Sequence, residues 1–106
     1  IYQTPLDLNG NLNDIFSRII NSSYYIIANI INEKSSTGSL NTKSQNKILP
    51  AKKRRTPSMS EITKKELDEL TAKDLYNKIR CLQDPYPNAY ITCKDGSKLY
   101  ITGAHL

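Results

Sequence analysis

The chain of 106 residues has no tryptophan and only one histidine, two cysteines and four glycines. His105 stands next to the last residue, with no Asp, Ser or Cys spaced to form a catalytic triad. No glycine-rich loop follows a predicted strand, so no phosphate-binding loop is expected. The acidic residues at 66–69 lie on a short helix that we expect to be solvated, whereas general acid–base catalysis needs shielding. The sequence predicts no catalytic residue and no metal site.

The cysteines and the apolar segments limit where the protein can work. Cys81 and Cys93 form no Cys-x-x-Cys motif and have no accompanying histidine. This arrangement favours reduced thiols in a cytoplasmic protein over a disulfide or a metal site. No apolar run approaches the ~20 residues that span a bilayer, and no charged-then-apolar leader is present. We therefore expect a protein that has no contact with membranes.

The net charge of +5 comes mainly from one cationic run, residues 47–55. A nucleic-acid-binding surface usually spreads its cations over a face and adds aromatic side chains for stacking. No aromatic residue lies between residues 26 and 75. The composition leaves three interpretations of this run open: solvated charge in a linker, a nuclear-localisation signal, and an RNA-binding patch. A fourth is that Arg54 and Arg55 bind a carboxylate or phosphate, for which the guanidinium fork is suited.

A long amphipathic helix is predicted after the turn at Gly10. Asn11 can cap it, and Asp14 favours the positive end of the helix dipole. Apolar residues then recur at spacings of three and four over about six turns, roughly 33 Å. They are Leu12, Ile15, Phe16, Ile19, Ile20, Ile26, Ile27, Ile30 and Ile31. This stripe needs a partner surface, which we expect to be a dimer mate or another part of the same protein. Residues 1–6 before it are expected to be extended, because Pro5 cannot donate to a β-ladder.

The rest of the chain predicts a linker, short helices and a hairpin. Residues 35–47 contain one large apolar residue and many turn formers, which indicates a mobile loop. A capping box at residues 63–66 predicts one or two helical turns, and Thr71 with Asp74 begins a clearer helix. We expect its buried stripe to comprise Ala72, Leu75, Tyr76, Ile79 and Leu82, and its wet face Lys73, Asn77, Lys78 and Arg80. Two β-prone segments around the turn at residues 94–97 predict a hairpin. The fold class is therefore α+β.

The segment Asp84-Pro85-Tyr86-Pro87 is a second candidate binding element. Two prolines fix the backbone around one tyrosine, so the ring would lose little entropy on binding a ligand. Such a ring can pack on a base or sugar, and its hydroxyl can donate to a phosphate. The alternative interpretation is that Tyr86 only packs the hairpin against the preceding helix.

Three segments, taken in order, resemble the folate-dependent formyltransferases. "KKRRTPSMSEI" is similar to a joint with the pattern Arg-Arg-x-Pro-x-x-Ser-x-Ile. "DLYNKIRCLQDPYPNAYI" resembles the helix and Pro-Tyr-Pro turn that come after this joint. The opening "IYQTPLDLNGNLNDIFSRI" is similar to the segment after the catalytic Asp-x-Gly-Asp loop of the family. The resemblance covers nearly the whole chain.

The resemblance implies a C-terminal part of a larger α/β enzyme whose catalytic Asn, His and Asp lie upstream of this sequence. It implies 10-formyltetrahydrofolate as the formyl donor and a primary amine as the acceptor. Residues 1–34 would be the tail of the catalytic domain, residues 35–62 a loop and basic linker, and residues 63–106 a C-terminal helix and hairpin that could form a homodimer.

The resemblance leaves the acceptor open between a nucleotide-linked amino sugar and initiator methionyl-tRNA. Family members that act on the tRNA carry a long barrel after the Pro-Tyr-Pro turn, whereas nineteen residues follow Pro87 here. The amino-sugar class is therefore favoured, with Tyr86, Arg54 and Arg55 as the expected substrate-binding residues. A rival hypothesis is a non-catalytic module that dimerises or binds RNA through residues 47–55.

Overall fold

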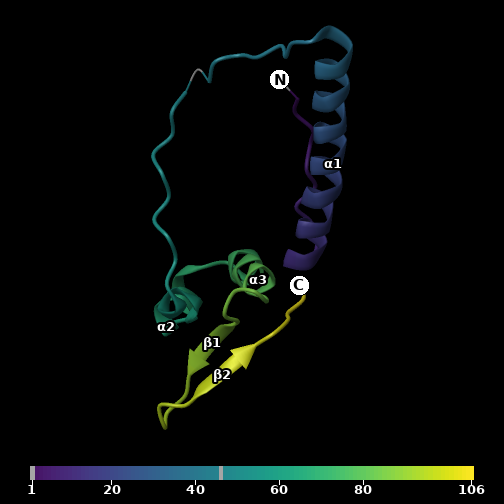
Figure 1. The fold of residues 1–106 in the computed structure, drawn as a ribbon. Coiled ribbons are helices and arrows are strands. Elements are labelled where there is room, and N and C mark those ends of the chain that lie inside the picture. Colours follow the sequence, from purple (N-terminus) through teal and green to yellow (C-terminus); the bar gives the residue numbers. More distant parts are fainter. Residues whose placement is uncertain (1, 46) are drawn as a thin grey trace. The chain divides into compact units, whose positions relative to one another are not determined.

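The structure is a computed structural model that describes residues 2–45 and 47–106. The element order begins with the long helix α1 (Leu12–Thr37), labelled in Figure 1, and continues with the 3₁₀ turn η1 (Pro57–Ser60). The helices α2 (Lys64–Glu69) and α3 (Ala72–Cys81) follow, and then the strands β1 (Ala89–Thr92) and β2 (Lys98–Ile101). The predicted α+β class is confirmed. The expectation for Ile1 lies outside the described residues.

The chain divides into two compact units, residues 1–9 with 14–52, and residues 10–13 with 53–106. In the first unit the N-terminal arm is extended and runs along α1 (Figure 1). The Tyr2 hydroxyl donates to Glu33 Oε2 at 2.7 Å, and the Arg18 guanidinium donates to the carbonyls of Asp7 (3.2 Å) and Asn9. These bonds hold the arm against one side of the helix.

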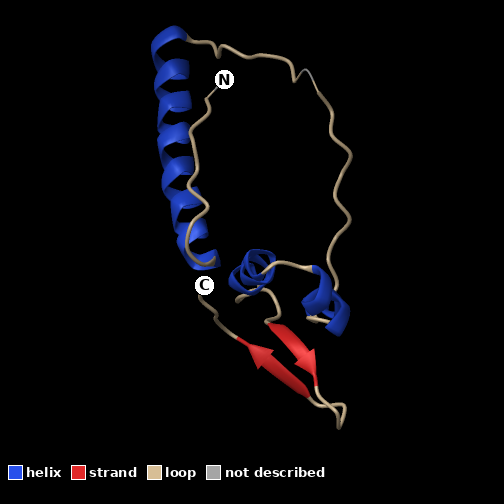
Figure 2. Ribbon diagram, turned by 180° about the vertical axis from the view of Figure 1, so that it is seen from behind, coloured by secondary structure: helices blue, strands red, loops and turns tan. Residues whose placement is uncertain are grey.

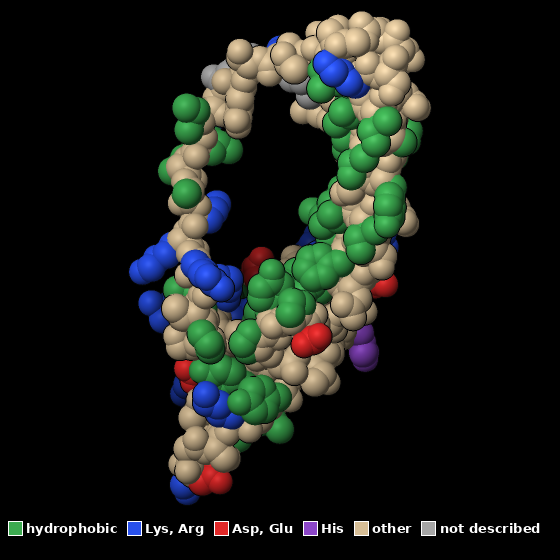
Figure 3. Space-filling view, viewed as in Figure 1, with side chains coloured by type: hydrophobic (Ala, Val, Ile, Leu, Met, Phe, Trp, Pro, Cys, Tyr) green, Lys and Arg blue, Asp and Glu red, His purple; other side chains and the backbone are tan. Residues whose placement is uncertain are grey.

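The long helix is confirmed, and it extends to Thr37, six residues or nearly two turns beyond the last residue of its predicted apolar stripe, Ile31. The expectation of a loop is therefore wrong for residues 35–37, which complete α1. Gly38, with a φ of 74°, ends the helix, and its N–H donates to the Lys34 carbonyl. Part of the apolar stripe is exposed, as Figure 3 shows along α1. The exposed members of the stripe are Ile19, Ile20, Ile27 and Ile31, and Tyr24, outside the predicted stripe, is also exposed. None of the helices among the described residues is long and apolar enough to cross a membrane.

In the second unit both predicted helix starts carry a complete capping box. The Thr63 hydroxyl accepts from the Glu66 N–H while the Glu66 carboxylate accepts from the Thr63 N–H. Thr71 and Asp74 make the same reciprocal pair at the start of α3. Each box satisfies two helix-end donors that would otherwise lack partners. The η1 turn is a feature that the sequence did not predict.

The predicted hairpin is confirmed as two antiparallel strands (Figure 2) with Ala89 opposite Ile101 and Thr92 opposite Lys98. The Gly96 N–H donates to the Cys93 carbonyl at 3.0 Å, and Gly96 adopts a φ of 82°. A side chain at this φ would be strained, so glycine suits the position.

The core of the second unit lies between α3, the segment before α2, and β1. It contains Ile62, Ile79, Leu82 and Ala89, with Leu75, Ile91 and Ile101 packed against it. Two expectations for α3 are wrong. Ala72 is exposed because it lies in the first turn, away from this core. The Lys78 side chain, expected on the wet face, is only 14% exposed because its ammonium is bound by neighbouring oxygens.

Candidate functional site

The second unit has a groove of about 1380 Å³ whose lining includes all three predicted substrate-binding residues. Arg54 and Arg55 lie on the segment before η1, and Tyr86 lies between α3 and β1. The lining also includes Thr56, Pro57, Ser58, Met59, Ser60, Glu61, Thr63, Glu66, Lys78, Cys81, Leu82, Pro85 and Pro87. The sequence singled out Tyr86 and the arginines separately, and the fold brings them to one surface.

The groove is assembled by backbone pairing between distant segments. The Ile62 N–H donates to the Tyr90 carbonyl at 2.7 Å, within an isolated parallel bridge between Glu61 and Tyr90. The Thr92 hydroxyl donates to Glu61 Oε1 at 2.7 Å. These bonds fix the segment that follows η1 beside β1. The residues before η1 therefore share a groove with the Pro-Tyr-Pro turn.

The two arginines differ in their hydrogen bonding. Arg55 Nη2 donates to the Met59 carbonyl at 2.8 Å, which links the guanidinium across the η1 turn. Arg54 is exposed, and within the described part of the chain no hydrogen bond or ion pair is found for its guanidinium. Thr56 and Ser58 add two hydroxyls, whose oxygens lie 2.9 Å apart. Arg54 thus brings a cation with uncommitted donors to the groove, and the hydroxyl pair, in which one O–H donates to the other oxygen, leaves one further donor.

Tyr86 is 53% exposed, so its ring does not simply fill a gap between the hairpin and α3. Its N–H donates to the Gln83 carbonyl at 2.8 Å, and prolines flank it on both sides. The backbone at this turn is thereby held in place while much of the ring remains accessible. This geometry leaves the aromatic face able to stack on a ligand.

Lys78 and Glu66 form an ion pair in the wall of the groove. The sequence did not predict this pair. Lys78 Nζ lies 2.8 Å from Glu66 Oε1 and 3.0 Å from Oε2, and it also donates to the Glu61 carbonyl. The hydrogen bond from Lys78, with that from the Thr63 N–H, lowers the pKa of Glu66 below its ordinary 4.5. The spacing of twelve residues between the partners gives no helical signal in sequence.

The charges of the groove favour an anionic ligand. Its lining carries three cations, Arg54, Arg55 and Lys78, against two carboxylates, Glu61 and Glu66. Since Lys78 is committed to Glu66 and to a backbone carbonyl, the arginines carry the charge that is left for a ligand. A guanidinium binds phosphate or carboxylate with two parallel hydrogen bonds.

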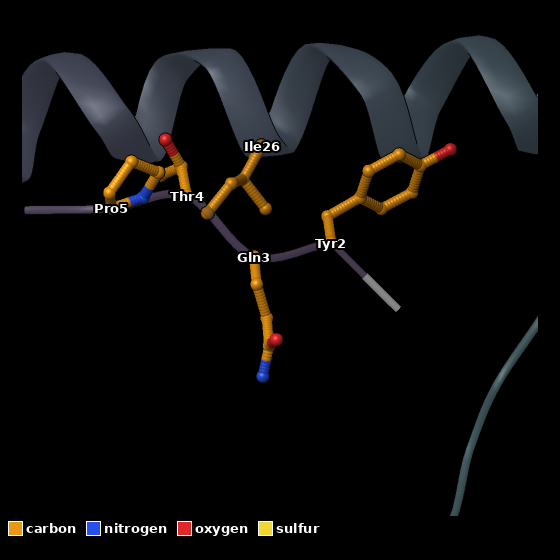
Figure 4. A pocket seen from close by; sticks show the side chains of 5 residues that line it. All are labelled: Tyr2, Gln3, Thr4, Pro5 and Ile26. Atoms are coloured by element: carbon orange, nitrogen blue, oxygen red, sulfur yellow. The ribbon is translucent and has the colours of Figure 1, made fainter.

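A second hollow lies in the first unit, between the arm and α1. Tyr2, Gln3, Thr4, Pro5 and Ile26 line it, and Figure 4 shows the Gln3 side chain directed away from the helix. None of these five residues is charged at neutral pH. The Tyr2 hydroxyl is bound to Glu33, and this hydrogen bond raises the pKa of Tyr2 and lowers that of Glu33. The described residues that line the hollow therefore offer no charged group for recognition and no nucleophile or base for catalysis.

The potential metal ligands and the two cysteines among the described residues form no second candidate site. Within residues 2–45 and 47–106 no group of three or more His, Cys, Asp or Glu side chains is arranged to hold a metal ion. Cys81 is partly buried in the groove wall, Cys93 is exposed, and both are unpaired.

Comparisons with known proteins support a formyltransferase relationship. The structure is similar to methionyl-tRNA formyltransferase from Clostridium thermocellum, with a TM-score of 0.59 and 25% sequence identity. The match covers 94% of this chain and 46% of that protein, so the chain spans less than half of that length. No protein-family model and no curated protein matches the chain. The fold of this chain therefore matches a segment of that formyltransferase.

Proposed function

We propose that this chain is the C-terminal portion of an enzyme that transfers a formyl group from 10-formyltetrahydrofolate to the amine of a nucleotide-linked amino sugar. The likeness to a formyltransferase over 94% of the chain is the observation that carries the proposal. In the reaction the amine nitrogen bonds to the formyl carbon, and the bond from that carbon to folate N10 breaks. The amine loses one proton and N10 gains one, which releases tetrahydrofolate and a sugar formamide.

The groove supports the assignment of a phosphate-bearing acceptor with a flat ring. Two guanidinium groups and a half-exposed tyrosine line one groove. Its volume of about 1380 Å³ is ample for a nucleoside diphosphate and its sugar. In this proposal the arginine pair supplies the positive charge that attracts the phosphates, and Tyr86 packs on the base or sugar. The reacting groups and most of the folate pocket belong to the N-terminal portion of the same protein.

A second acceptor, methionyl-tRNA, is favoured by the function of the structural neighbour. It would present the same phosphate and base chemistry to the groove, but as part of a macromolecule. The two acceptors make different demands on the protein. A tRNA acceptor needs an extended cationic surface, whereas a nucleotide-linked sugar needs only the groove.

The RNA-binding module proposed as a rival uses residues 47–55 without any catalysis. Neutralising about five phosphates would make log K fall with log salt at a slope near −4 to −5 on a duplex. In the structure Ile48 and Leu49 are 91% and 68% exposed between the cations of this run, which lies on a segment without regular structure. An unstructured cationic segment suits weak, salt-sensitive binding better than specific recognition.

The test is an acceptor panel with the full-length protein that contains this chain. Purified protein would be supplied with 10-formyltetrahydrofolate and with nucleotide-linked amino sugars, the matching N-acetylated sugars as controls, or methionyl-tRNA. The proposal expects turnover of an amino-sugar nucleotide and none of its N-acetylated control. Turnover of methionyl-tRNA alone would favour the second acceptor, and turnover of neither would remove the enzyme assignment.

We also propose that the intact protein is a homodimer. The exposed apolar residues Leu99 and Tyr100, each 56% exposed, lie on opposite faces of β2, so either face of the hairpin can contribute to the contact. Such residues are uncharged and include an aromatic ring, as the cores of interfaces do. Light scattering of the full-length protein should give twice the subunit mass, and Leu99→Glu should reduce it toward one subunit.

A further inference from the structure

The two adjacent arginines of the groove are not equivalent in the structure. Arg55 Nη2 donates a hydrogen bond to the Met59 carbonyl at 2.8 Å, and this bond spans the η1 turn. At the ends of the turn, the Met59 N–H donates to the Thr56 carbonyl and the Glu61 N–H donates to the Ser58 carbonyl. Arg55 therefore adds a side-chain link across this four-residue element.

Arg54 has the opposite character. Its side chain is exposed and lines the groove, and no partner is found for its guanidinium within the described residues. A guanidinium with free donors is suited to a phosphate oxygen pair, and the hydrogen-bonded hydroxyls of Thr56 and Ser58 line the same groove. Its neighbour Lys53 is an exposed cation that does not line the groove, so it provides a matched control.

From this contrast we infer a division of roles: Arg54 contacts the phosphate of the acceptor directly, and Arg55 is a positioning residue that holds η1 and the groove wall in shape. The inference rests on the proposed function and adds to it which arginine meets the ligand. Since η1 leads directly into the paired segment at Ile62, loosening this turn would shift the groove lining rather than remove a ligand contact.

The first arm of the test is steady-state kinetics of the full-length enzyme with the turned-over acceptor. Arg54→Ala should raise the KM for that acceptor roughly ten- to a hundredfold, which corresponds to the loss of a charge-assisted hydrogen bond. The KM for 10-formyltetrahydrofolate should not change. Arg54→Lys should restore part of the loss, because it keeps the charge without the fork. The difference between Arg54→Ala and wild type should shrink as salt is raised, since exposed charges are screened.

The second arm is hydrogen–deuterium exchange of the peptide that covers residues 56–62. Arg55→Ala should speed the exchange of the Met59 and Glu61 amides, whereas Arg54→Ala and Lys53→Ala should leave it unchanged. Nucleoside diphosphates, UDP and dTDP, serve as probes of direct binding, and a ribo-oligonucleotide distinguishes an RNA phosphate. Arg54→Ala should weaken inhibition by a diphosphate, and Lys53→Ala should not.

The outcomes separate this inference from the proposed function. Two outcomes with an active enzyme would overturn the division of roles alone. One is an equal rise in the acceptor KM for Arg54→Ala and Arg55→Ala, and the other is unchanged hydrogen exchange at η1 in Arg55→Ala. Tighter binding of the oligonucleotide than of either diphosphate, with the same Arg54 dependence, would assign the contact to RNA and overturn it as well. A wild-type protein with no formyl transfer to any acceptor overturns both.

Discussion

Replacing Lys78 by Met should loosen the groove wall without touching the arginines. The substitution keeps a long apolar stem but removes the ammonium that binds both Glu66 oxygens, at 2.8 and 3.0 Å, and the Glu61 carbonyl. A charge-assisted hydrogen bond contributes roughly 1.5–3 kcal/mol, whereas an exposed ion pair contributes about 0.2–1 kcal/mol. Because Lys78 is 14% and Glu66 31% exposed, we expect an intermediate loss of about 1.5 kcal/mol.

Hydrogen exchange of α2 in the full-length protein measures this loss locally. The amides of Leu67 and Leu70, which bond to the Thr63 and Glu66 carbonyls, should exchange about tenfold faster in Lys78→Met. Lys65→Met removes the same charge from an exposed position in α2 and should have little effect. Equal protection in the two variants would show that the ion pair contributes nothing and refute the reasoning.

The pH dependence of the same pair follows from the lowered pKa of Glu66. A carboxylate whose folded pKa is below 4.5 contributes its full stabilisation above its unfolded pKa and loses it as pH falls through the folded value. Glu66→Gln keeps a side chain that can complete the capping box but carries no charge. The difference in α2 protection between wild type and Glu66→Gln should therefore be constant near neutral pH and vanish well below pH 4.5.

Three further predictions concern the ligand, the core and a helix cap. Tyr86→Ala should raise the KM for the acceptor but not that for the folate, and Tyr86→Phe should recover the part that comes from ring packing; equal effects on both substrates would contradict the assignment. Ile62→Ala, at a side chain 5% exposed, should cost about 2–5 kcal/mol in denaturant unfolding, and a cost below about 1 kcal/mol would argue against the core described above. Thr71→Ala should cost about 1 kcal/mol, measured as faster amide exchange in the first turn of α3; Thr71→Ser should retain the cap, and equal exchange in the two variants would exclude it.

Much of the local structure could be predicted because its causes are local. The spacing of isoleucines set α1, the Thr63 and Thr71 capping boxes set the starts of α2 and α3, and Gly96 set the hairpin turn. These signals act within a few residues of one another. They indicate where an element begins without reference to its partners.

The groove depends on contacts that sequence spacing does not encode. The bridge between Glu61 and Tyr90 and the pair between Lys78 and Glu66 join segments from separate elements. Helical periodicity predicted that Lys78 lies on a solvent-exposed face. A periodicity within one helix contains no information about a carboxylate that another helix supplies. The same limit explains why the sequence did not distinguish Arg54 from Arg55. The difference between them lies in the hydrogen bond from Arg55 to the Met59 carbonyl across η1.

The most direct measurement tracks the formyl carbon itself. The full-length protein would be incubated with 10-formyltetrahydrofolate labelled with ¹³C in the formyl group and with a nucleotide-linked amino sugar, and the products would be observed by NMR. We predict that the label appears as a formamide on the sugar nitrogen, at a rate that Tyr86→Ala lowers when the acceptor is limiting. Label that stays on the folate or is released only as formate would contradict formyl transfer to the sugar.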